Sequence, residues 1–81
     1  MIENLRYSGY DANYIRGFEA AEEFVKLEAA PAGSYCVAMI NQEIKTFISA
    51  FGGDVRPGIS IIGYIDGLQY FANVIQLEAS A

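Results

Sequence analysis

The first periodic pattern along the chain lies in residues 11–30. Four apolar side chains recur there at steps of four, three and four residues, which places them on one face of a helix: Tyr14, Phe18, Ala21 and Val25. The opposite face carries Arg16, Glu19, Glu23 and Lys26. Asp11 can cap the first turn and Pro31 can end the last one, so the pattern predicts a helix over these residues.

Two later blocks repeat the helical spacing. In residues 34–51 the shared apolar face consists of Val37, Ile40, Ile44, Phe47 and Phe51. In residues 59–78 the apolar stripe consists of Ile61, Ile65, Leu68, Ala72 and Ile75. The complementary polar stripe is Asp66, Gln69, Asn73 and Gln76. Three helices with short connections predict an all-α fold, a small antiparallel three-helix bundle.

A hairpin interpretation competes with the last two helices. Residues 59–65 are rich in β-branched side chains, and Asp66 followed by Gly67 is a strong two-residue turn signal. The alternative fold is α+β, with one helix on a four-stranded antiparallel sheet. On a strand, however, Gln69 and Gln76 would point to opposite faces and the polar stripe would be lost. The spacing therefore favours helices, although Gly63 and Gly67 each cost a helix interior about 1 kcal/mol.

The third predicted helix carries more apolar residues than one stripe needs. No helix is central in a three-helix bundle, so this excess predicts a homo-oligomer. Glycines four residues apart would let a second backbone approach closely. The expected oligomer interface is Ile62, Gly63, Gly67, Tyr70 and Phe71. The alternative is that Tyr70 and Leu77 are ordinary exposed apolar residues, which are common.

Size and charge limit the classes of function. The chain has 81 residues, which predicts one domain over residues 1–81 with an N-terminal arm at residues 1–10. Ten acidic residues against five basic ones give a net charge of −5, which argues against direct binding of nucleic acid. The first residues lack the pattern of a secretory signal, and Asp66 interrupts the one long apolar stretch. We therefore expect a cytoplasmic protein with no membrane association.

The composition also argues against catalysis. The chain has no His and one Cys, which excludes imidazole catalysis, His-ligated metals and an internal disulfide. Cys36 has no activating base and is expected to be a buried, inert thiol. The crowded carboxylates of Glu19, Glu22 and Glu23 lack a converging second segment, so we expect a solvated face. No catalytic residue, metal or cofactor is predicted.

The strongest candidate for a contact surface lies near the N-terminus. Three tyrosines fall on one side of a helix between two arginines, and Tyr and Arg are the residues that most often anchor protein interfaces. Together with the acidic positions of the first helix, they predict a surface that binds a partner protein. Its residues are Arg6, Tyr7, Tyr10, Tyr14, Arg16, Glu19, Glu22 and Glu23.

These features favour a non-enzymatic, acidic interaction module that docks on a basic or nucleic-acid-handling partner protein and inhibits it. The analogy to viral counter-defence inhibitors rests on size and charge alone. The alternative is a small-ligand binder that holds an anionic metabolite or nucleotide at an oligomer interface. Loop amides and a guanidinium would supply that site, at Gly53, Arg56 and Gly58.

Overall fold

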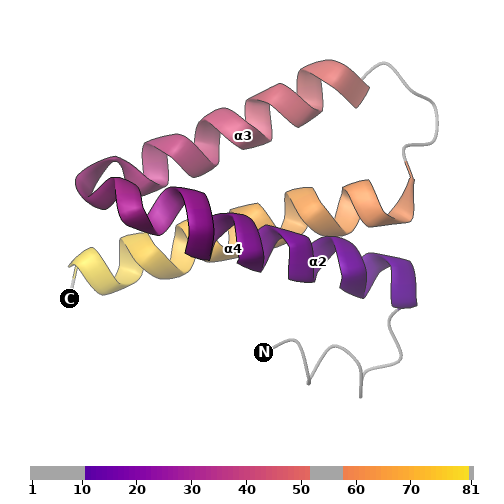
Figure 1. The fold of residues 1–81 in the computed structure, drawn as a ribbon, viewed down its shortest axis with the longest axis horizontal. Helices are drawn as coiled ribbons and strands as arrows, with labels where there is room; N and C mark the ends of the chain where they lie inside the picture. Colours follow the sequence, from indigo (N-terminus) through magenta and orange to yellow (C-terminus); the bar gives the residue numbers. More distant parts are fainter. Residues whose placement is uncertain (1–10, 52–57, 81) are drawn as a thin grey trace.

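The computed structural model describes residues 11–51 and 58–80, except for the side chains of residues 79 and 80. The elements are α2 (Ala12–Phe24), the π-helical turn η1 (Val25–Ala29), the 3-10 turn η2 (Ala30–Tyr35), α3 (Cys36–Phe51) and α4 (Ile59–Ser80) (Figure 1). These residues contain no strand. The all-helical prediction is thus confirmed for this part of the chain, and the hairpin alternative is wrong there. The arrangement is compatible with a helical bundle.

The first helix begins as predicted but ends differently. The Asp11 carboxylate accepts a hydrogen bond from the Asn13 N–H at 2.7 Å, which caps α2. Regular α-helix stops at Phe24, and turns of other pitch carry the chain past Pro31, because proline is tolerated in the first turn of a helix. The helical path breaks at Gly33, where φ is +62° and ψ is −120°. The glycine, rather than the proline, separates the first two helices.

Helices α2 and α4 run in the same direction, cross each other in the view of Figure 1 and touch through glycines. A β-carbon on Gly17 would overlap the Ser60 carbonyl group, and one on Gly63 would overlap the carbonyl group of Tyr14. A β-carbon on Gly67 would lie 2.7 Å from the β-carbon of Ala21. The glycines of α4, unfavourable for an isolated helix, therefore permit direct backbone contact between the two helices.

The core lies where α4 meets both other helices. Ile40 of α3 and Leu68 of α4 are its largest fully buried side chains. The other buried residues of this cluster are Ala21, Ala29, Cys36 and Ala72. All four members of the predicted polar stripe on α4 are exposed, as the helical spacing requires: Asp66, Gln69, Asn73 and Gln76. The predicted burial of Cys36 is also confirmed.

Four of the five residues predicted for the oligomer interface lie instead against α2 of the same chain. Gly63 and Gly67 form the backbone contact, and the rings of Tyr70 and Phe71 each lie 5.7 Å from the ring of Phe18. The prediction of an oligomer assumed that no helix of a three-helix bundle is central enough to bury apolar residues beyond one stripe. Because α4 packs against both α2 and α3, its two glycines are buried within one chain, whereas Tyr70 and Phe71 stay half-buried and Ile62 is exposed. The predicted self-association stays a prediction.

Candidate functional site

The outward side of α2 and η1 carries a mixed but mainly acidic set of side chains. Arg16, Glu23 and Lys26 are exposed, whereas Glu19 and Glu22 are half-buried. Glu22 forms an ion pair with Lys26 at 3.6 Å across one helical turn, and such exposed pairs stabilise a helix by only a few tenths of a kcal/mol. An open hollow of about 530 Å³ lies along this side. Its described lining includes four of the predicted partner-binding residues: Arg16, Glu19, Glu22 and Glu23.

Leu27 is the most exposed large apolar side chain on this side, with 64% of its surface accessible. It lies one helical turn after Glu23 and next to Glu28, both exposed. Within the described part of the chain, neither carboxylate has a hydrogen bond or an ion pair. Sequence reasoning did not select Leu27. The sequence does contain a signal for this exposed side chain, because Leu27 follows Glu23 by four residues and so falls on the polar side of the predicted helix.

Tyr14 lies between two helices rather than on the outward side. Its hydroxyl donates a hydrogen bond to the Asp66 carboxylate at 2.8 Å, and its ring lies 6.4 Å from the ring of Phe18. This tyrosine therefore joins α2 to α4, and its predicted role as a partner anchor has no support from its position. The other N-terminal members of the predicted surface, Arg6, Tyr7 and Tyr10, lie outside the described residues.

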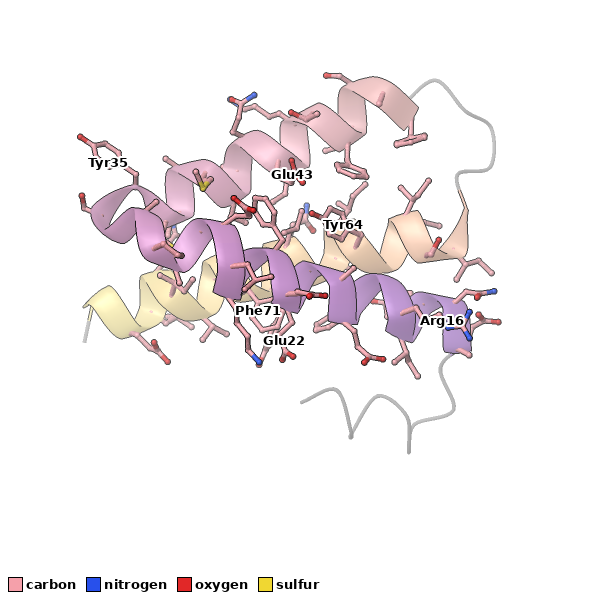
Figure 2. The ribbon with its side chains drawn as sticks, viewed as in Figure 1. Arg16, Glu22, Tyr35, Glu43, Tyr64 and Phe71 are labelled. Carbon is pink, nitrogen blue, oxygen red and sulfur yellow. The ribbon has the colours of Figure 1, made fainter. Side chains whose placement is uncertain are left out.

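A second tyrosine–carboxylate pair joins α3 to α4. The Tyr64 hydroxyl donates to the Glu43 carboxylate at 2.8 Å, and the Phe47 ring lies 4.7 Å from the Tyr64 ring. Figure 2 shows the two side chains pointing toward each other between the helices. Burial, followed by the hydrogen bond and the negative charge of Glu43, raises the pKa of Tyr64 well above its ordinary value. The phenol therefore stays protonated at neutral pH and acts as a hydrogen-bond donor.

A small apolar cleft lies beside this pair, and α2, α3 and α4 all contribute to its lining. It measures about 310 Å³. Its described lining is Arg16, Gly17, Ala20, Phe47, Ser60, Ile61 and Tyr64. Sequence reasoning missed both the cleft and the Tyr64–Glu43 pair. The two residues belong to different helices, and only the packing of those helices brings them together.

Of the three residues predicted to bind an anion, the structure describes one. Gly53 and Arg56 lie outside the described residues. Gly58 is exposed, and its carbonyl accepts hydrogen bonds from the N–H groups of Ile61 at 3.0 Å and Ile62 at 3.1 Å. This glycine therefore lies immediately before α4 and accepts hydrogen bonds from its first turn, and a role in ligand binding stays a prediction.

Chemistry-bearing groups are sparse in the described part of the chain. Cys36 is buried in the core. Within residues 11–51 and 58–80, no three carboxylate or thiol side chains converge as a metal site would need. No helix of this part has both the length and the apolar character needed to cross a bilayer.

Comparison of the chain with models of protein families, with curated proteins and with solved structures found no match.

Proposed function

We propose that the protein is a non-enzymatic interaction module that docks on a basic surface of a partner protein. The docking surface is the outward side of α2 and η1, here named the α2 face: Arg16, Glu19, Glu22, Glu23, Lys26, Leu27 and Glu28. The observation that supports the proposal is the exposed Leu27 side chain beside the carboxylates of Glu23 and Glu28.

The chemistry of the α2 face suits such a partner. Burying one leucine in an apolar depression contributes about 1.5–3 kcal/mol. Carboxylates around an apolar anchor favour a surface of opposite charge, accelerate the encounter and repel acidic competitors. The net charge of −5 adds to this attraction over a longer range. The expected partner is a protein with Lys and Arg side chains around a shallow apolar depression.

A protein that binds nucleic acid has a basic surface of this kind. We infer that the chain, acting in the cytoplasm, covers such a surface and so inhibits its partner. The inference rests on charge complementarity, and the analogy to counter-defence inhibitors supports it through size and charge alone.

The proposal is tested by substituting the anchor and its carboxylates. Tagged wild-type protein, Leu27→Ala and Glu23→Lys/Glu28→Lys are used to capture binding proteins from an extract of the source cells. Leu77→Ala is the matched control, because Leu77 is also a leucine with a largely exposed side chain, 72% accessible, and lies on α4.

We expect a basic protein retained by the wild type and by Leu77→Ala but lost from both α2-face variants. With purified components, the affinity should fall as salt concentration rises. Equal capture by all four proteins, or capture that is insensitive to salt, contradicts docking through the α2 face.

We also propose that the helices form a bundle that self-associates through the outer side of α4. Ile59 and Ile62, three residues apart on α4, are 47% and 39% exposed. Light scattering over a dilution series tests this directly. A mass that stays at one chain at all concentrations refutes self-association, while a larger mass that is reduced by Ile62→Asp supports it.

A further inference from the structure

Three of the four residues of the polar stripe on α4, Gln69, Asn73 and Gln76, form one wall of a groove that the α2 face does not use. This groove measures about 520 Å³ and lies between α3 and α4. Its described lining is Asn41, Ile44 and Lys45 from α3 with Gln69, Ala72, Asn73 and Gln76 from α4. Buried Ala72 and half-buried Ile44 are the apolar members of this lining.

The carboxamide side chains of this lining are exposed: Asn41, Gln69, Asn73 and Gln76. Within residues 11–51 and 58–80, none of them uses its side-chain donors or acceptor in a hydrogen bond. Lys45 is the one charged residue of the described lining. The groove therefore offers several neutral groups, each of which can donate and accept at the same time.

A peptide main chain has the matching chemistry, because each unit presents one N–H donor and one C=O acceptor. In an extended chain the N–H and C=O of one residue point to the same edge, so a carboxamide can pair with both. A nucleobase is the other partner that amides pair with, but single-stranded bases also need aromatic side chains for stacking. The described lining has none, and the net charge of −5 opposes phosphates.

The spacing of two amides on α4 agrees with an extended chain. Gln69 and Asn73 are four residues apart, which is about 6 Å along the helix axis. An extended strand repeats the same edge every two residues, or about 6.6 Å. These two amides can therefore pair with alternate residues along one edge of the bound chain.

We propose that the groove binds an extended, uncharged segment of a protein through its main chain, with a small apolar side chain over Ala72. The site is separate from the α2 face, since the two surfaces share no residue. The groove would be a second recognition surface, which selects its partner by backbone conformation rather than by charge.

The first test uses a phage-displayed library of short random peptides, with the selected peptides then measured by fluorescence anisotropy. Gln69→Ala and Asn73→Ala should each weaken binding about threefold to tenfold, the loss expected for one hydrogen-bonding group. Gln42→Ala is the matched control, because Gln42 is an exposed amide of α3 that does not line the groove. Methylating alternate backbone nitrogens of the peptide should reduce binding more than tenfold, because it removes the donors.

Selection of no peptide, or of peptides that bind Gln69→Ala and Asn73→Ala as tightly as wild type, overturns the proposal. Leu27→Ala leaves the groove intact, so failure here is distinguishable from failure of the α2 face.

The second test follows the side-chain NH₂ resonances of the four amides by NMR. Adding a selected peptide should shift them and leave the Gln42 resonances in place. Shifts that follow protein concentration alone identify a second copy as the occupant, and shifts caused by oligo-dT identify nucleic acid. Either result overturns peptide binding at this groove.

Discussion

Gly17 of α2 lies directly against the main-chain carbonyl group of Ser60 on α4, and no space for a β-carbon separates them. Tyr14 and Gly63 repeat the relationship with the roles of the helices reversed. Both contacts involve backbone atoms, which cannot move aside as a flexible side chain can. These positions therefore set how closely the two helices pack.

Gly17→Ala is expected to destabilise the protein. Alanine is about 1 kcal/mol better than glycine inside a solvated helix, so the substitution would otherwise be favourable. Here the added methyl group forces α2 away from α4 and disturbs the buried Phe18, for a net loss of about 1–3 kcal/mol. Urea unfolding followed by circular dichroism measures the change.

The matched control is Gly58→Ala, where the nearest atom to a new β-carbon is 3.9 Å away. Its effect should stay within about 0.5 kcal/mol. A Gly17→Ala protein as stable as the wild type would contradict the backbone contact.

Tyr64→Phe tests the pair between α3 and α4. At neutral pH the loss of the hydroxyl leaves half-buried Glu43 without its donor, which should cost about 0.5–1.5 kcal/mol. The raised pKa of Tyr64 means that the unfolded chain loses this proton first, from about pH 10 upward. The contribution of Tyr64 to stability is therefore complete below pH 10 and declines above it.

Urea unfolding at a series of pH values from neutral to alkaline should show a smaller alkaline decline in Tyr64→Phe than in the wild type. Ultraviolet titration of the phenols should show one tyrosine fewer that resists ionisation in this variant. Tyr35→Phe controls for loss of a hydroxyl, because that side chain is 73% exposed. Identical pH profiles for Tyr64→Phe and the wild type would rule out the proposed coupling.

Gly33→Ala should destabilise the protein although a β-carbon there meets no atom within 4 Å. The reason is the backbone conformation, because φ of +62° with ψ of −120° is accessible almost only to glycine. An L-residue in such a region costs about 1–3 kcal/mol. A chemically synthesised chain with D-alanine at this position should retain wild-type stability, and equal losses for both enantiomers would contradict the conformation.

Leu68→Ala and Leu77→Ala compare two leucines of one helix. Leu68 is fully buried, and its truncation should cost about 2–5 kcal/mol, a large part of the stability of so small a domain. Leu77 is largely exposed, and its truncation should cost no more than about 0.5 kcal/mol. Thermal unfolding by circular dichroism measures both, and losses of similar size would contradict the assignment of the core.

The sequence predicted the helix cap and the exposed positions correctly where these depend only on residues within one helix. The Asp11 cap and the exposed stripe that includes Gln69 and Asn73 depend on contacts or exposure within one helix. The end of the first helix was placed wrongly, because Pro31 fits the first turn of a new helical segment and Gly33 makes the break. That choice depends on the turn geometry of neighbouring residues rather than on the apolar period.

The candidate surfaces were less accessible to sequence reasoning. Tyr14 has the composition of an interface anchor, yet its hydroxyl reaches Asp66, 52 positions later in the chain. Gly63 and Gly67 do permit a close approach, but the approaching helix belongs to the same chain. Leu27 and the amide groove emerge only when the exposed fraction of each side chain is known.

The sequence by itself determined that the described segments are helical and which side of each helix is polar, because these properties follow from spacing along one chain segment. It also determined the acidic charge and the lack of imidazole chemistry. Only the tertiary structure decided that α2 occupies the glycine face of α4 and that Tyr64 meets Glu43. The physical reason is that an apolar or glycine face can pack against any helix of suitable shape, so its sequence does not specify its partner. Which helix packs against it depends on the shape and register of all the helices together.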